Sequence, residues 1–164
     1  MPILLSGSSG ITYPNTTVGT TGNGPAFAVF LGTSQTVANN TDTKVQLNSE
    51  IFDTANCFDS TTNFRFTPNV AGYYQINATV NVGFNTSAGI SIVRIYKNGS
   101  LYVELYRGQN QPNTGLEISG GALIFFNGTT DYVELYFFQN TGSSQPVGGG
   151  SSSTQMSGAL VRGA

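Results

Sequence analysis

The order of apolar and polar positions predicts a series of short β-strands separated by turns. Short apolar runs alternate with clusters of Gly, Asn, Asp, Pro and Ser, and no stretch keeps a helical period over two turns. This pattern predicts an all-β, antiparallel sandwich. The predicted strands are Pro25–Gly32, Lys44–Phe52, Asn63–Pro68, Gly72–Phe84, Ile90–Lys97, Leu101–Arg107, Leu116–Phe126, Asp131–Gln139 and Gln155–Val161.

Gly72–Phe84 shows the clearest alternation in the chain. Successive side chains of a strand point to opposite faces, so one face of this strand belongs to the core and the other does not. The apolar row consists of Tyr74, Ile76, Ala78, Val80, Val82 and Phe84. The polar row consists of Tyr73, Gln75, Asn77, Thr79 and Asn81.

Asn98–Gly99 links two predicted strands and is the strongest hairpin signal in the chain. Asn and Gly accept the positive φ angles that a type I′ turn requires at its two central positions. A two-residue turn here predicts that Tyr96 pairs with Leu101 and Ile95 with Tyr102. Both faces of this hairpin are then largely apolar, so one covers the core and the other meets an arm, a loop or another subunit.

Two segments differ in composition from the rest. Residues 1–24 are rich in Gly, Ser and Thr and predict an N-terminal arm, followed by one domain over residues 25–164. Asn140–Ser153 predicts a long surface loop. Ile3–Leu5 is too short for a signal peptide or a membrane span, so we expect no membrane insertion.

Charge and composition exclude several classes of protein. Charged residues make up only 9% of the chain and the net charge is −2. The scattered cations do not form the cluster that nucleic-acid binding needs. The chain has no histidine, which excludes Ser/His/Asp and Cys/His catalysis and the usual zinc sites. Cys57, the one cysteine, is expected to be a small buried apolar side chain rather than a reactive thiol.

Three sets of side chains are candidates for chemistry. Glu104 and Glu134 could form a glycosidase pair, although a mid-strand glutamate beside tyrosines is usually solvated. Hard oxygen ligands in predicted loops could bind calcium, or they could close Asx-turns; these are Asp42, Asp53, Asp59, Asn39, Asn40 and Asn56. Aromatic side chains could contact sugars or proteins, or could pack under loops; these are Tyr102, Tyr106, Tyr132 and Tyr136.

Several segments together resemble the globular heads of C1q-like proteins. Phe52–Thr54, Phe58–Asp59 and the run Phe64–Ile76 are similar to the segment that leads into a long inner strand in that family. Further segments resemble the family's small-residue strand, turn and closing strand; these are Ser119–Ile124, Asn127–Gly128, Asp131–Val133 and Ser157–Val161.

The resemblance implies a ten-stranded jelly roll, C1q/TNF-like, that assembles as a homotrimer. The strands starting near Pro25, Gly72, Leu116 and Gln155 would lie inward, while Ile90–Arg107 and Asp131–Gln139 would lie outward. The polar row would then face the neighbouring subunits; its members are Tyr73, Gln75, Asn77, Thr79 and Asn81. No cofactor is implied, although some relatives carry calcium.

We expect no signal peptide, collagen stalk or disulfide in this chain, which would set it apart from animal C1q-like proteins. It is more similar to the C1q-like proteins of bacteriophages. We therefore expect a non-enzymatic virion protein, made in the host cytoplasm, whose head forms a fibre tip or adhesin that contacts host polysaccharide or protein. Residues 1–24 would bind another virion protein. The alternative is a capsid decoration or cement protein, or a tail connector.

Overall fold

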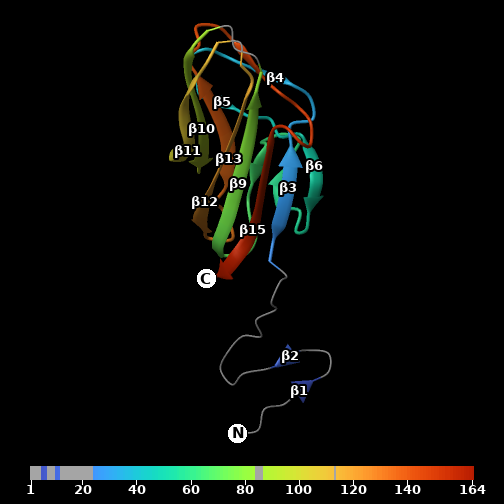
Figure 1. Cartoon of the computed structure of the whole chain (residues 1–164). Coiled ribbons are helices and arrows are strands. Elements are labelled where there is room, and N and C mark those ends of the chain that lie inside the picture. Colours follow the sequence, from blue (N-terminus) through green and yellow to red (C-terminus); the bar gives the residue numbers. More distant parts are fainter. Residues whose placement is uncertain (1–4, 7–9, 12–23, 84–86, 113) are drawn as a thin grey trace.

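Two antiparallel sheets pack face to face in the computed structural model, which describes residues 5–6, 10–11, 24–83, 87–112 and 114–164 (Figure 1). The seven-stranded sheet consists of β3 (Ala26–Phe30), β4 (Gln35–Val37), β6 (Ser49–Asp53), β9 (Gly72–Val82), β12 (Leu116–Phe126), β14 (Gln145–Val147) and β15 (Gln155–Gly163). The six-stranded sheet consists of β5 (Thr43–Lys44), β7 (Phe58–Asp59), β8 (Arg65–Phe66), β10 (Gly89–Lys97), β11 (Ser100–Asn110) and β13 (Val133–Gln139).

The described residues contain no helix, so none of them belongs to a helix that could cross a membrane. The all-β prediction is confirmed, and so is the division of the strands between two sheets. β3, β9, β12 and β15 share one sheet, while β10, β11 and β13 share the other. The strand count exceeds the ten implied by the resemblance because pieces of two or three residues, such as β7 and β8, are counted separately.

β9 lies in the middle of the seven-stranded sheet and shows the predicted alternation. It pairs with β12 on one side and with β15 and β14 on the other. Side chains at its even positions are buried, from Tyr74 at 0% exposed to Val82 at 1%, whereas Tyr73 is 44% exposed. β9 therefore presents one face to the core and one to the surface of the sandwich.

Aromatic rings pack between the two sheets near the start of β9 and the end of β12. Phe66 on β8 stacks on Phe27 of β3 with a centroid distance of 4.1 Å. It also meets Tyr74 and Phe126 edge-on at 5.6 and 5.8 Å. All four rings are fully buried. The Tyr74 hydroxyl keeps a partner because it donates to the carbonyl of Val70 at 2.9 Å.

The Asn98–Gly99 turn forms as predicted, but the register beyond it differs. Both residues have positive φ, 54° and 78°. Tyr96 pairs with Leu101 as expected, whereas Ile95 pairs with Val103 rather than with Tyr102. The ladder skips Tyr102 and, further along, Leu105, so β11 carries two bulges. Each extra residue reverses the face on which the following side chains lie. The predicted register, and the assignment of side chains to two faces that followed from it, was therefore wrong.

Two segment predictions also need correction. The predicted strand Lys44–Phe52 is broken into β5 and β6, with Val45 and Leu47 buried between them. The predicted loop Asn140–Ser153 contains β14, whose Gln145 and Val147 are buried. A strand as short as β14 leaves no periodicity to detect among Gly and Ser residues.

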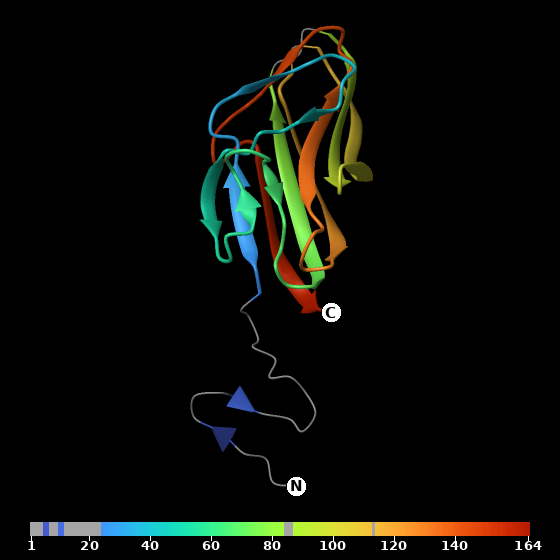
Figure 2. The same ribbon diagram turned by 180° about the vertical axis from the view of Figure 1, so that it is seen from behind.

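The predicted arm, residues 1–24, falls mostly outside the described residues. Its described strands are β1 (Leu5–Ser6) and β2 (Gly10–Ile11), which pair with each other. The boundary between arm and domain at residue 25 remains a prediction. The start of β3 and the end of β15 lie at the same end of the sandwich (Figure 1 and, from behind, Figure 2).

Candidate functional site

The outer face of the seven-stranded sheet carries the predicted polar row. Tyr73 and Asn77 are exposed, and the other three members are half-buried. Small residues pair with the middle of this row on β12 and β15, namely Ser119, Gly121, Ser157 and Ala159. Small side chains leave the face nearly flat, with a shallow hollow of about 290 Å³ over β15. A flat, hydrogen-bonding face of this kind suits contact with another protein surface.

At one end of this face several apolar side chains are exposed. We did not predict this patch from the sequence. Tyr73, Leu123 and Phe125 are 44%, 55% and 40% exposed, and we call these three residues the apolar patch. The rings of Tyr73 and Phe125 meet edge-on at 5.3 Å. Phe52 on β6, 48% exposed, lies on the same face. The signal was present in the sequence, because Leu123–Phe126 is apolar on both faces of its strand.

The four tyrosines proposed as a contact surface do not come together in one platform. Tyr106 is partly buried and packs against the core. Tyr136 stacks on Tyr96 with ring centroids 4.0 Å apart. Tyr102, at a bulge, is 51% exposed. The backbone nitrogen of Tyr132 donates a hydrogen bond to the side-chain oxygen of Asn98 at 3.0 Å.

Glu104 is held between two arginines. Nη2 of Arg107 lies 2.7 Å from its carboxylate and Nη2 of Arg94 lies 2.9 Å away. Hydrogen bonds from Arg107, and then from Arg94, lower the pKa of this carboxyl despite some desolvation. Glu134 is buried and accepts a hydrogen bond from Nζ of Lys44 at 2.5 Å. The catalytic acid of a glycosidase pair needs a raised pKa, so the lowered pKa of Glu104 does not suit it to that role.

The candidate calcium ligands are engaged with protein groups. Asp53 accepts hydrogen bonds from the backbone nitrogens of Ala55 and Phe58, and Asp42 accepts from Arg94. Asp59 closes the turn that follows it, as described below. Within residues 24–83, 87–112 and 114–164, no three Asp, Glu, Cys or His side chains are grouped for a metal. Asn39 accepts from the backbone of Gly142, while Asn40 and Asn56 have positive φ angles of 54° and 52°.

Cys57 is 7% exposed, and burial raises the pKa of its thiol. The prediction that it is buried is confirmed. A raised pKa keeps the sulfur protonated at neutral pH, which lowers its reactivity because the thiolate is the nucleophile.

Asp59 is expected to contribute stability that depends on pH. Its carboxylate accepts hydrogen bonds from the backbone nitrogens of Thr61, Thr62 and Asn63 and from the Asn63 amide, which lower its pKa. A carboxyl with a lowered pKa in the folded state stabilises the protein above its unfolded pKa, about 3.9, and this contribution is lost as the pH falls. Asp59→Asn should cost about 1 kcal/mol at pH 7, because a neutral amide oxygen accepts these hydrogen bonds more weakly than a carboxylate, and urea unfolding measures this cost. The difference from the wild type should shrink at pH 2.5, and a constant difference would contradict this account.

Comparisons with known proteins identify the fold. No family model and no curated protein sequence matches the chain. The globular domain of zebrafish complement 1qA protein is similar with a TM-score of 0.59 and 17% identity, covering 87% of this chain and 100% of that one. Eiger TNF from S. frugiperda is similar with a TM-score of 0.58 and 9% identity, over 85% and 95% of the two chains. The vertex protein P5 of PRD1 is similar with a TM-score of 0.54 and 18% identity, over 84% and 97%.

These likenesses cover nearly all of the solved chains. At such low identity they show the fold and not a shared activity. The two-sheet sandwich has the C1q/TNF-like jelly-roll fold that the sequence resemblance implied.

Proposed function

We propose that this chain is a non-enzymatic structural protein of a phage virion, whose head self-associates as a homotrimer. The observation that carries the proposal is the likeness to the vertex protein P5 of phage PRD1 over 84% of the chain.

The outer face of the seven-stranded sheet is the proposed contact between subunits. Its centre is the polar row, Tyr73, Gln75, Asn77, Thr79 and Asn81, and the apolar patch extends it at one end. Interfaces commonly combine exposed aromatic and aliphatic side chains with hydrogen-bonding groups and trapped water. Burying Leu123 and Phe125 against a second copy would remove their exposed apolar surface from water.

The proposed role of the trimer is to contact the host surface, as a fibre tip or adhesin, with residues 1–24 bound to another virion protein. Three weak sites on one particle raise the effective concentration for the second and third contacts. A capsid decoration role is the second candidate, favoured by the word "vertex" in the name of P5, because a vertex belongs to the shell of a particle. Copy number per virion separates the two, since a shell protein is abundant and a tail tip is not.

The first experiment is the absolute mass of the purified chain, measured by light scattering with and without residues 1–24. We expect the mass of three chains for both forms, because the proposed contact face lies entirely after residue 24. A monomeric mass for both forms would contradict the trimer and the assignment of the polar row to the contact between subunits. Binding to susceptible cells by the purified protein then tests attachment, and virions that bind while the protein does not would contradict it.

A further inference from the structure

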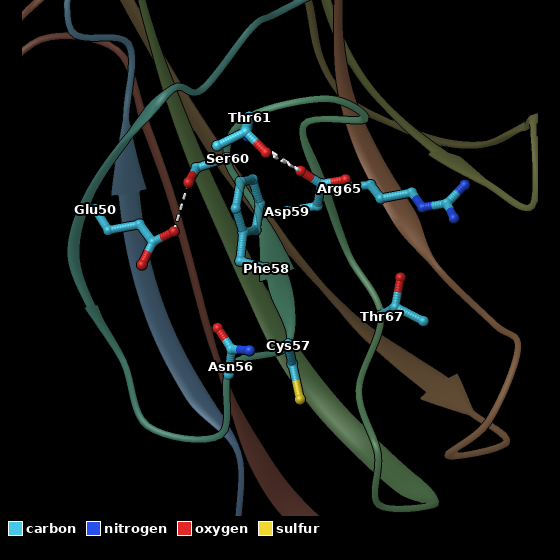
Figure 3. A pocket seen from close by; sticks show the side chains of 9 residues that line it. All are labelled: Glu50, Asn56, Cys57, Phe58, Asp59, Ser60, Thr61, Arg65 and Thr67. Carbon is cyan, nitrogen blue, oxygen red and sulfur yellow. Dashed lines mark hydrogen bonds between the residues drawn. The ribbon is translucent and has the colours of Figure 1, made fainter.

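A polar groove opens between the edge of β6 and the β7–β8 hairpin, on the side of the sandwich. It holds about 540 Å³, which is within the size range of small-ligand sites, roughly 300–1,000 Å³. Glu50 and Arg65 stand on opposite sides of it, with Ser60 and Thr61 between them (Figure 3). None of the residues of the polar row or of the apolar patch lines this groove, so it lies outside the proposed contact face.

The walls of the groove are fixed by hydrogen bonds inside the protein. Asp59 holds the loop after it through the backbone nitrogens of Thr61 and Thr62 at 3.0 and 2.9 Å. Asp53 holds the segment before β7 through the backbone nitrogen of Phe58 at 2.6 Å. Walls that are already ordered lose little conformational freedom on binding, so the groove is preorganised for a ligand.

Several polar groups that line the groove are left without a hydrogen-bond partner by the described part of the chain. Among the residues that the structure describes, the amide of Asn56, the hydroxyl of Thr67 and the guanidinium of Arg65 make no side-chain hydrogen bond. The Arg65 guanidinium carbon lies 4.3 Å from the ring centroid of Tyr132, which holds this cation in place. Glu50 uses one carboxylate oxygen to accept from Ser60 at 2.6 Å and keeps the other available.

Backbone strain marks the same region. Asn56 has φ of 52° and Phe64, next to Arg65, has φ of 51°. Asparagine tolerates this left-handed conformation, but a bulky residue such as phenylalanine rarely adopts it, and the cost is about 1–3 kcal/mol. Strain that the fold maintains at a groove is typical of a functional site, because the surrounding structure must hold it in place.

We propose that this groove binds a neutral, hydroxyl-rich oligosaccharide segment, a proposal that rests on the host-contact function and names the ligand class. Sugar hydroxyls both donate and accept, and the groove offers acceptors on Glu50 and Asn56 and donors on Arg65, Asn56 and Thr67. Two carboxylates and one guanidinium line it, which disfavours an anionic polymer. Its apolar residues are buried, with Phe58 only 5% exposed, which disfavours lipid and apolar peptide side chains.

The test is an NMR titration of the ¹⁵N-labelled full chain with defined probes. The neutral probes are maltohexaose, cellohexaose, mannohexaose and laminarihexaose; the comparison probes are hexagalacturonate and a Gly-Ser-Thr hexapeptide. We expect at least one neutral probe to shift the amide signals of residues 56–67, with a dissociation constant of about 1 mM or tighter. No shift in that segment with any neutral probe, or shifts there with the acidic or peptide probe alone, would overturn the proposal.

Two variants test whether the shifts of the amide signals come from binding in the groove. Thr67→Val keeps the shape of the side chain and removes the hydroxyl, while Arg65→Met keeps its length and removes the donors. Each should weaken binding about tenfold, whereas Thr36→Val, at an exposed position on β4, should not change it. Equal weakening by Thr36→Val would contradict the assignment. If both groove variants still attach to cells, the groove is not the ligand site, but the host-contact function is not contradicted.

Discussion

Leu123→Asp is expected to convert the proposed trimer into monomers. Leu123 is 55% exposed and lies on β12 beside Gln75 of the polar row. Burial of a leucine side chain contributes about 1.5–3 kcal/mol, and this is lost at each contact in the variant. A buried carboxylate without a cation also costs several kcal/mol. Together these effects should shift the light-scattering mass from three chains to one at micromolar concentrations.

Leu101→Asp is the matched control for this experiment. Leu101 is 49% exposed but lies on β11, in the six-stranded sheet, so the same change of charge and volume should leave the mass unchanged. Circular dichroism of both variants checks that the β-structure is retained. A trimeric Leu123→Asp protein, or dissociation by both variants, would show that the subunits meet through a different face.

Phe66→Ala is expected to destabilise the fold more than any surface change. Phe66 is fully buried and carries contacts from the six-stranded sheet to Phe27, Tyr74 and Phe126 of the other sheet. Removal of a buried phenylalanine ring costs about 3–5 kcal/mol, a large part of the roughly 5–15 kcal/mol by which domains are stable. Urea unfolding at fixed protein concentration measures this loss, because self-association also contributes to stability.

Tyr102→Ala provides the comparison for the core substitution. Tyr102 is an aromatic residue of similar size that is 51% exposed, so its truncation should cost less than about 1 kcal/mol. If the two variants unfold at the same urea concentration, Phe66 does not join the sheets in the way described. A Phe66→Leu protein should recover most of the loss, since leucine fills much of the same volume.

Long strands with regular alternation could be predicted from the sequence. β12 has the predicted bounds, Leu116–Phe126, and β9 differs from its prediction by two residues at one end, where Phe84 falls outside the described residues. Both strands run eleven residues, long enough for the two-residue period to stand out. The Asn98–Gly99 turn was also predictable, because few residue pairs accept its two positive φ angles.

Features set by contacts between distant segments could not be predicted. The bulges at Tyr102 and Leu105 carry no Gly or Pro, so nothing local distinguishes them from ordinary strand residues. The groove joins β6 to the β7–β8 hairpin, and its residues appear in the sequence as turn and strand-edge positions. The positive φ of Phe64 opposes the residue's own preference, so only the packing around it determines that conformation.

The position of β15 between β3 and β9 determines when the chain can fold during synthesis. β3 is the first strand of the sandwich and β15 the last, and they pair from Phe30 with Gln155 to Ala26 with Ala159. Until the ribosome has released β15, the seven-stranded sheet of the nascent chain is split, and β3 and β9 each expose an unpaired edge. This sheet therefore cannot close before β15 has emerged from the ribosome. Chains that stall before residue 155 will present aggregation-prone edges to chaperones and to one another.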